Sequence, residues 1–97
     1  MRKGWKLIKM ELSNRKNKKY AATIRRGTAT RVVHFGHSAY PQYRDSTHLA
    51  KYKAKNHMDP KRRRAYFMRH SGVPTKEKAL QKTKKFSARY FSHRYLW

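Results

Sequence analysis

Hydrophobic and polar residues alternate near the start of the chain. The segment WKLIKMEL places Ile8, Met10 and Leu12 on one side and charged residues between them. Alternation with a period of two residues is typical of a strand with one buried face. The pattern therefore predicts a strand over residues 5–12, with these three side chains facing the interior.

Two further segments have the same strand character. KYAATIRR places Tyr20, Ala22 and Ile24 on one side, and ATRVVHF is rich in β-branched and aromatic residues. Gly27 lies between them and can supply the positive φ of a tight turn. Three strands with short links predict an antiparallel meander that ends near Gly36.

The periodicity changes beyond residue 37. In DSTHLAKYKAKNH, the candidate N-cap is Asp45, Ser46 or Thr47, and Leu49 and Tyr52 lie three residues apart on one side. This spacing predicts a helix over residues 45–57.

A second helix has sharper ends. Asp59 is a good N-cap, Pro60 suits the first helical position, and Gly72 is a natural stop, which predicts a helix over residues 60–71. Thr75 can cap a further helical stretch that continues through the closing aromatic residues, either as one helix or as two broken near residues 85–87.

These elements predict an α+β fold: a small antiparallel three-stranded meander followed by two or three helices, with basic extended segments. At this length we expect a single small basic domain over residues 1–97, β-rich over 1–36 and mainly helical over 37–97.

The net charge is the most informative feature of the composition. The 97 residues include 27 Lys and Arg but only four acids, which gives a formal net charge of +23. Such a chain repels itself and is expected to need an acidic partner. Its 13% aromatic content distinguishes it from disordered basic tails, which are poor in aromatic residues. No apolar run approaches the ~18 residues of a transmembrane helix, so we expect no membrane span.

Candidate chemistry is sparse. There is no cysteine, and the six histidines have few carboxylates beside them to complete a metal site. Acid–base catalysis needs placed carboxylates or an oriented histidine, and no glycine-rich phosphate loop is present. The sequence therefore favours a protein that is not an enzyme, with no cofactor, no metal and no small-molecule substrate.

Basic clusters interleaved with aromatic residues are the strongest functional pattern, because Lys and Arg neutralise phosphates or acidic protein surfaces. We expect one contact group in the Arg-rich helix and a second around the hairpin. The predicted contact residues are Lys61, Arg62, Arg63, Arg64 and Arg69, together with Lys16, Lys18, Lys19, Arg25 and Arg26. The predicted core or docking residues are Phe35, Tyr66, Phe91, Tyr95 and Trp97.

Three motifs suggest a family. VHFGHSAYPQY, HMDPKRRRAYFMRH and FSARYFSHRYLW, in this order, resemble a group of small basic proteins of large double-stranded DNA viruses of eukaryotes. Members show a strand ending in Phe-Gly, spaced tyrosines, a His-x-Asp before an Arg-rich helix, and a closing aromatic helix with Leu-Trp. The resemblance covers residues 20–97. Phe91 departs from it, since Trp is expected there, and the second link between strands is short.

The resemblance implies a structural component of a virus particle, located in the virion and inside the cell during assembly. A minor capsid (cement) protein that binds acidic faces of capsid proteins is the leading interpretation, with the packaged double-stranded DNA as a further partner. The alternative, which composition alone favours, is a ribosomal-type protein that binds rRNA.

Overall fold

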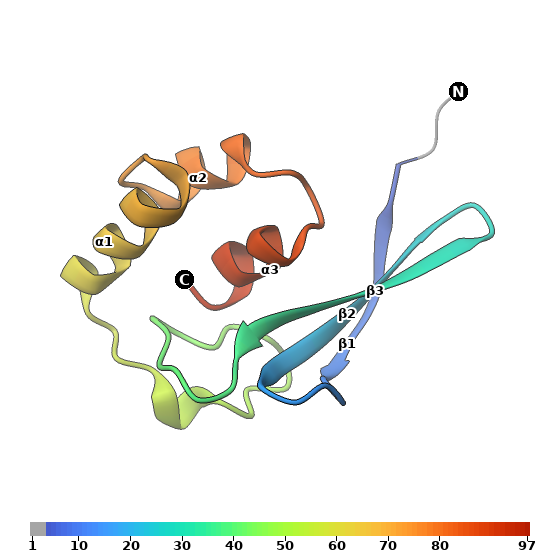
Figure 1. Ribbon diagram of the computed structural model, residues 1–97, viewed down its shortest axis with the longest axis horizontal. Coiled ribbons are helices and arrows are strands. Elements are labelled where there is room, and N and C mark those ends of the chain that lie inside the picture. Colours follow the sequence, from blue (N-terminus) through green and yellow to red (C-terminus); the bar gives the residue numbers. More distant parts are fainter. Residues whose placement is uncertain (1–3) are drawn as a thin grey trace.

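The computed structural model describes residues 4–97, so residues 1–3 of the predicted domain lie outside the described part. An antiparallel sheet in the order β1-β2-β3 is followed by a single 3-10 turn, η1, and three helices (Figure 1). The elements are β1 (Lys6–Leu12), β2 (Lys18–Arg26), β3 (Ala29–His37), η1 (Lys53–Lys55), α1 (Pro60–Ser71), α2 (Lys76–Lys82) and α3 (Ala88–Tyr95). The α+β fold with a three-stranded meander is therefore confirmed.

The predicted inner face of β1 is partly wrong. Met10 is buried, but Ile8 and Leu12 are about half exposed. The register of β1 against β2 shifts between Leu7 and Lys9, which marks an irregularity of the β-bulge type. An extra residue reverses the alternation that follows it, so Leu7 packs against the core in place of Ile8.

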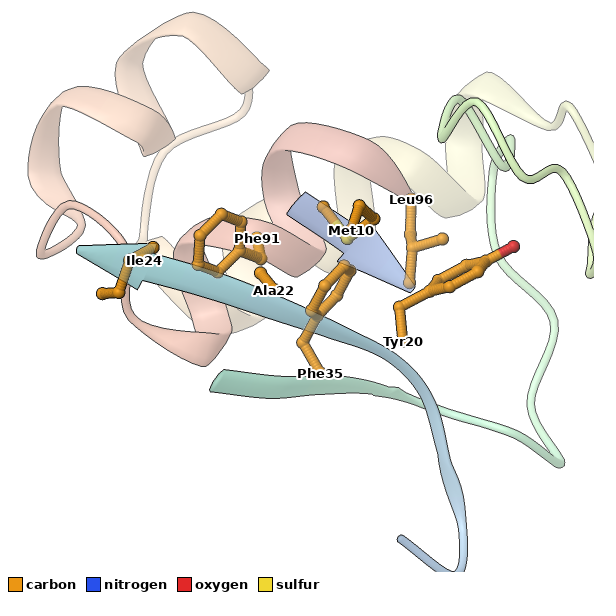
Figure 2. Packing of buried hydrophobic residues seen from close by; sticks show 7 residues of the cluster. All are labelled: Met10, Tyr20, Ala22, Ile24, Phe35, Phe91 and Leu96. Carbon is orange, nitrogen blue, oxygen red and sulfur yellow. The ribbon is translucent and has the colours of Figure 1, made fainter. Parts of the chain in front are cut away.

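The main core lies between one face of the sheet and α3. Phe91 and Leu96 from the α3 region meet Phe35 of β3 (Figure 2), and the rings of Phe35 and Phe91 are stacked 5.4 Å apart. The inner residues of β2, as predicted, join this cluster: Tyr20, Ala22 and Ile24. A smaller cluster of Tyr66, Phe67 and Ala79 joins α1 to α2.

The helix ends follow the predicted signals. The Asp59 carboxylate accepts from the backbone N–H of Lys61 at 2.9 Å, and Gly72 ends α1 in the left-handed conformation with φ +71°. Thr75 caps α2. The closing stretch is two helices rather than one, since residues 83–87 are not helical and Phe86 has φ +65°.

The predicted helix over residues 45–57 is wrong, and "mainly helical" holds only beyond residue 59. Apart from η1, residues 38–57 form an irregular connection. The reason is Asp45, which is buried and does not cap a helix. Its carboxylate accepts from the Tyr20 hydroxyl, from the backbone N–H and hydroxyl of Thr47, and from the Tyr52 N–H. These tertiary hydrogen bonds outweigh local helix propensity.

We call this region, formed by Lys19, Tyr20, Gln42, Asp45 and Asn56, the polar interior. Gln42 has no exposed surface, and its amide donates to the Asn56 side chain and to the Tyr52 carbonyl. Burial, followed by hydrogen bonding to Asp45, raises the pKa of Tyr20 to about 12. Buried polar groups thus help to fix the connection, beside Leu49 and Tyr52, which pack against the main core.

Candidate polyanion interface

The positive charge is not neutralised inside the molecule. Within residues 4–97 one ion pair forms, between Lys9 and Glu11 at 3.6 Å, and both side chains are exposed. Asp45 is buried in the polar interior, and Asp59 caps α1. Apart from Lys9, the exposed lysines and arginines therefore face solvent without an ion-pair partner from the described residues.

The second predicted basic group does not form one region. Lys16 and Lys18 lie at the turn between β1 and β2, whereas Arg25 and Arg26 lie at the far end of β2. At ~3.3 Å per residue, the ends of this nine-residue strand are about 26 Å apart. At the far end, Arg26 also stacks over the ring of Trp5 with 4.8 Å between its guanidinium carbon and the ring centroid.

Lys19 does not fit the predicted contact group. Only 2% of its surface is exposed, and its ammonium donates to the Tyr40 carbonyl at 2.7 Å and to Gln42 Oε1 at 2.5 Å. Burial, and after it the charge of Lys55, lowers the pKa of Lys19 to about 8. Lys19 is thus a structural residue of the polar interior, although it also borders the cleft described below.

Arg63 is also held by the fold. Its Nε donates to the backbone oxygen of Trp97 at 3.0 Å, and its guanidinium lies 4.6 Å from the Tyr43 ring centroid. The other predicted residues of α1 are exposed: Lys61, Arg62, Arg64 and Arg69. Arg62 and Arg69 fall on one stripe of α1 with Tyr66, because positions four and seven residues apart share a helix face.

That stripe forms one wall of a cleft of about 500 Å³, which we call the aromatic–basic cleft. Its lining residues come mainly from α1, from the end of the chain after α3 and from the loop after β3, three segments that lie near one another in Figure 1. Among residues 4–97, no Asp or Glu side chain lines it. Its lining side chains include Lys18, Arg62 and Arg69, with His37, Tyr40, Tyr66, His70 and Trp97. The structure thus brings Lys18 together with the α1 arginines.

The loop wall of this cleft carries an exposed aromatic pair. The rings of His37 and Tyr40 are stacked 4.3 Å apart at 21°, and 64% of Tyr40 is exposed. Sequence reasoning did not place His37 or Tyr40 among the site residues. The signal that was available is the spacing of the two residues in a turn directly after the Phe-Gly that ends β3.

A second basic cavity of about 600 Å³ lies between the end of α1 and the start of α3. Its charged lining residues are Lys82, Lys84 and Arg89, and His70 borders both cavities. None of these three residues is among the predicted contact residues. The two cavities extend the exposed positive surface around the helical part of the molecule.

The predicted core or docking residues pack within the chain. Phe35, Phe91 and Tyr66 are buried, and Tyr95 packs partly buried against the main core. Trp97 packs against both clusters and stacks on Tyr66 with 4.1 Å between ring centroids. Trp97 therefore joins the sheet core to α1.

Two histidines have structural positions. His93 is fully buried, with Tyr66 Oη 2.8 Å from its Nδ1 and Ser71 Oγ 2.9 Å from its Nε2. Burial, with a smaller contribution from His70, lowers the pKa of His93 to about 4. In the His-x-Asp motif, His57 Nδ1 accepts from the Asp59 N–H at 3.0 Å, which orients the entry to α1.

Residues 4–97 contain no group of three or more histidines and carboxylates close enough to hold a metal ion. Across the same residues, every helix is too short or too polar to cross a bilayer. No protein-family model, curated protein or solved structure matches the chain.

Proposed function

We propose that this protein is a non-enzymatic structural component of a large DNA virus particle, where it acts as a minor capsid protein that binds acidic faces of capsid subunits. The observation that carries the proposal is the unneutralised positive charge: a net +23, with one ion pair among residues 4–97. The motif resemblance supplies the virion setting, and the charge supplies the mode of binding.

The distribution of charge supports a role inside an assembly. Exposed cations lie at both ends of β2, on α1 and around the second cavity, so they do not form one face. A compact body with like charges on several sides is stabilised when acidic surfaces surround it. A cement protein between capsid subunits is in such an environment.

The acidic residues support a role without catalysis. Asp45 is buried under four hydrogen bonds, and Asp59 is occupied as a helix cap. Glu11 pairs with an exposed lysine, and Glu77 lies in the first turn of α2. A general acid–base pair requires carboxylates or histidines at a substrate site, and these four have other positions.

The test is the release of the chain from purified particles of the virus that encodes it. Particles are disrupted in steps of rising salt, with and without nuclease, and the chain is located in each fraction by mass spectrometry. We expect it to stay with the capsid shells after nuclease treatment and to leave them at high salt, because ionic contacts are screened.

Release with the nucleic acid after nuclease treatment would contradict the capsid assignment and identify the genome as the acidic partner. Absence from particles would contradict the virion setting itself. In that case the remaining candidate is an RNA-binding protein of ribosomal type. The observation that favours this second candidate is the aromatic–basic cleft, since RNA binders combine cations with rings that stack on unpaired bases.

A further inference from the structure

The His37–Tyr40 pair has the geometry of a stacking platform. One face of the Tyr40 ring lies against His37, and its 64% exposure leaves the other face open. Large exposed aromatic rings contribute nothing to a core, and an open ring face beside cations is suited to a flat aromatic partner. The platform therefore needs a ligand with a planar ring.

This platform is held in place before any ligand arrives. The Tyr40 N–H donates to the His37 carbonyl at 3.2 Å, and the Tyr40 carbonyl accepts from the buried Lys19 ammonium. Gly36, with φ +77°, admits no side chain, because an added Cβ would lie 2.8 Å from Leu96 Cδ1. A fixed ring loses little conformational entropy when a ligand binds.

The cations of the cleft supply the second half of the recognition. Lys18, Arg62 and Arg69 line the same space as Tyr40 and are exposed, and no Asp or Glu of the described residues lines that space. Arginine binds phosphate oxygens through two parallel N–H donors. The ligand thus combines a flat ring with negative charge at neighbouring positions.

From this arrangement we propose that the aromatic–basic cleft binds a nucleotide within single-stranded nucleic acid. The base stacks on Tyr40, and the flanking phosphates contact Lys18, Arg62 and Arg69. The cleft volume of about 500 Å³ lies within the ~300–1,000 Å³ of ligand pockets. A paired base cannot reach the platform, and an acidic peptide would leave the ring unused. The inference goes beyond the proposed capsid role and does not depend on it.

The experiment separates the base from the phosphates. Fluorescence anisotropy measures binding of the full chain to a labelled oligothymidylate and to an abasic oligonucleotide of the same length, which has the same phosphates but no bases. We expect the base-containing strand to bind about 5- to 160-fold more tightly, which corresponds to the ~1–3 kcal/mol that stacking of a base on an aromatic ring gives.

Variants assign this preference to the platform. Tyr40→Ala should bind both oligonucleotides equally, whereas Tyr40→Phe, which keeps the ring, should retain the preference for bases. Met68→Ala, an exposed change elsewhere on α1, is the control and should behave like wild type. Equal affinity of wild type for both strands, or a preference that survives in Tyr40→Ala, would overturn the proposal.

A competition experiment distinguishes a nucleotide within a strand from a free nucleotide. Thymidine 5′-monophosphate should displace the oligonucleotide only weakly, because it lacks the neighbouring phosphates. Displacement at equal concentration would keep nucleotide recognition at this cleft but overturn its assignment to a strand. Failure of the base preference leaves the salt-dependent binding of acidic surfaces untouched, so the two proposals fail separately.

Discussion

Lys18 and Lys19 are neighbours on β2 and both border the aromatic–basic cleft, but the fold holds their side chains differently. Lys19 lies in the polar interior, where its ammonium donates to Gln42 and to the Tyr40 carbonyl. Lys18 is exposed and lines the aromatic–basic cleft. The same residue type thus supports the fold at one position and faces solvent at the next. The difference shows that cation count alone overstates the binding surface.

The largest expected effect comes from the polar interior. Asp45→Asn removes a charge that accepts four hydrogen bonds and places an amide donor among their donors. We expect the free energy of unfolding to fall by about 3 kcal/mol. Chemical denaturation measures it.

The matched control is Asp59→Asn, the same change at the N-cap of α1, where asparagine caps as well as aspartate. It should alter stability by only a few tenths of a kcal/mol. Equal effects at the two sites would contradict the special role of the buried carboxylate.

His93 provides a pH test of the interior beneath α1. Its folded pKa of about 4 lies below the unfolded value of 6.5, so the unfolded chain takes up a proton first as pH falls. The stabilisation that neutral His93 gives the folded state is fully present above pH 6.5. It is lost as the pH falls toward 4, which lowers the free energy of unfolding by about 2–3 kcal/mol.

Denaturation curves from pH 7 to pH 4 measure this loss. His57 and His70 also have a lowered pKa from burial and act in the same direction. Comparison with His93→Gln, which keeps both a donor and an acceptor, isolates His93: the variant should lose less stability on acidification. Parallel curves for the two proteins would show that His93 does not titrate as its burial implies.

Substitution of the two adjacent lysines should give the smallest changes in stability, but changes of opposite kind at the two positions. Lys19→Met leaves buried Gln42 Oε1 without its lysine donor and should cost about 1–2 kcal/mol of stability. Lys18→Met should leave stability within about 0.5 kcal/mol. Conversely, Lys18→Met should reduce the salt dependence of polyanion binding by about one ion, whereas folded Lys19→Met should not change it. If Lys18→Met lost stability and Lys19→Met lost salt dependence, the structural role of Lys19 and the binding role of Lys18 would both be refuted.

Much of the fold was predictable because its signals are local. Alternation in β2, the positive φ at Gly27, and the Asp59–Pro60 and Gly72 signals of α1 each depend on a few neighbouring residues. The conformation of residues 38–57 could not be predicted in this way, because the hydrogen-bond partners of Asp45 include Tyr20, which lies 25 residues away in the sequence. The exposure of Ile8 depends on the strand irregularity beside it, which no pattern marked.

The site was predictable in part. The exposed arginines of α1 follow from the charge pattern, but the burial of Lys19 and the anchoring of Arg63 to Trp97 depend on tertiary contacts. A combined Arg62→Ala and Arg63→Ala variant would therefore also remove the Arg63 hydrogen bond to Trp97, so it would test the fold together with binding. The pairing of Arg62 with Arg69 is the better test, because both line the cleft.

The most direct measurement compares two double variants on α1. Arg62→Ala with Arg69→Ala removes two cations that line the cleft, and Lys61→Ala with Arg64→Ala removes two exposed cations of the same helix that do not. Binding to a single-stranded oligonucleotide is measured over a range of salt concentrations, with unfolding curves as the control for folding.

If the cleft is the binding site, the first variant loses affinity and about two ions of salt dependence, while the second stays close to wild type. Equal losses in the two variants would mean that the positive surface acts without a defined site and would contradict the account.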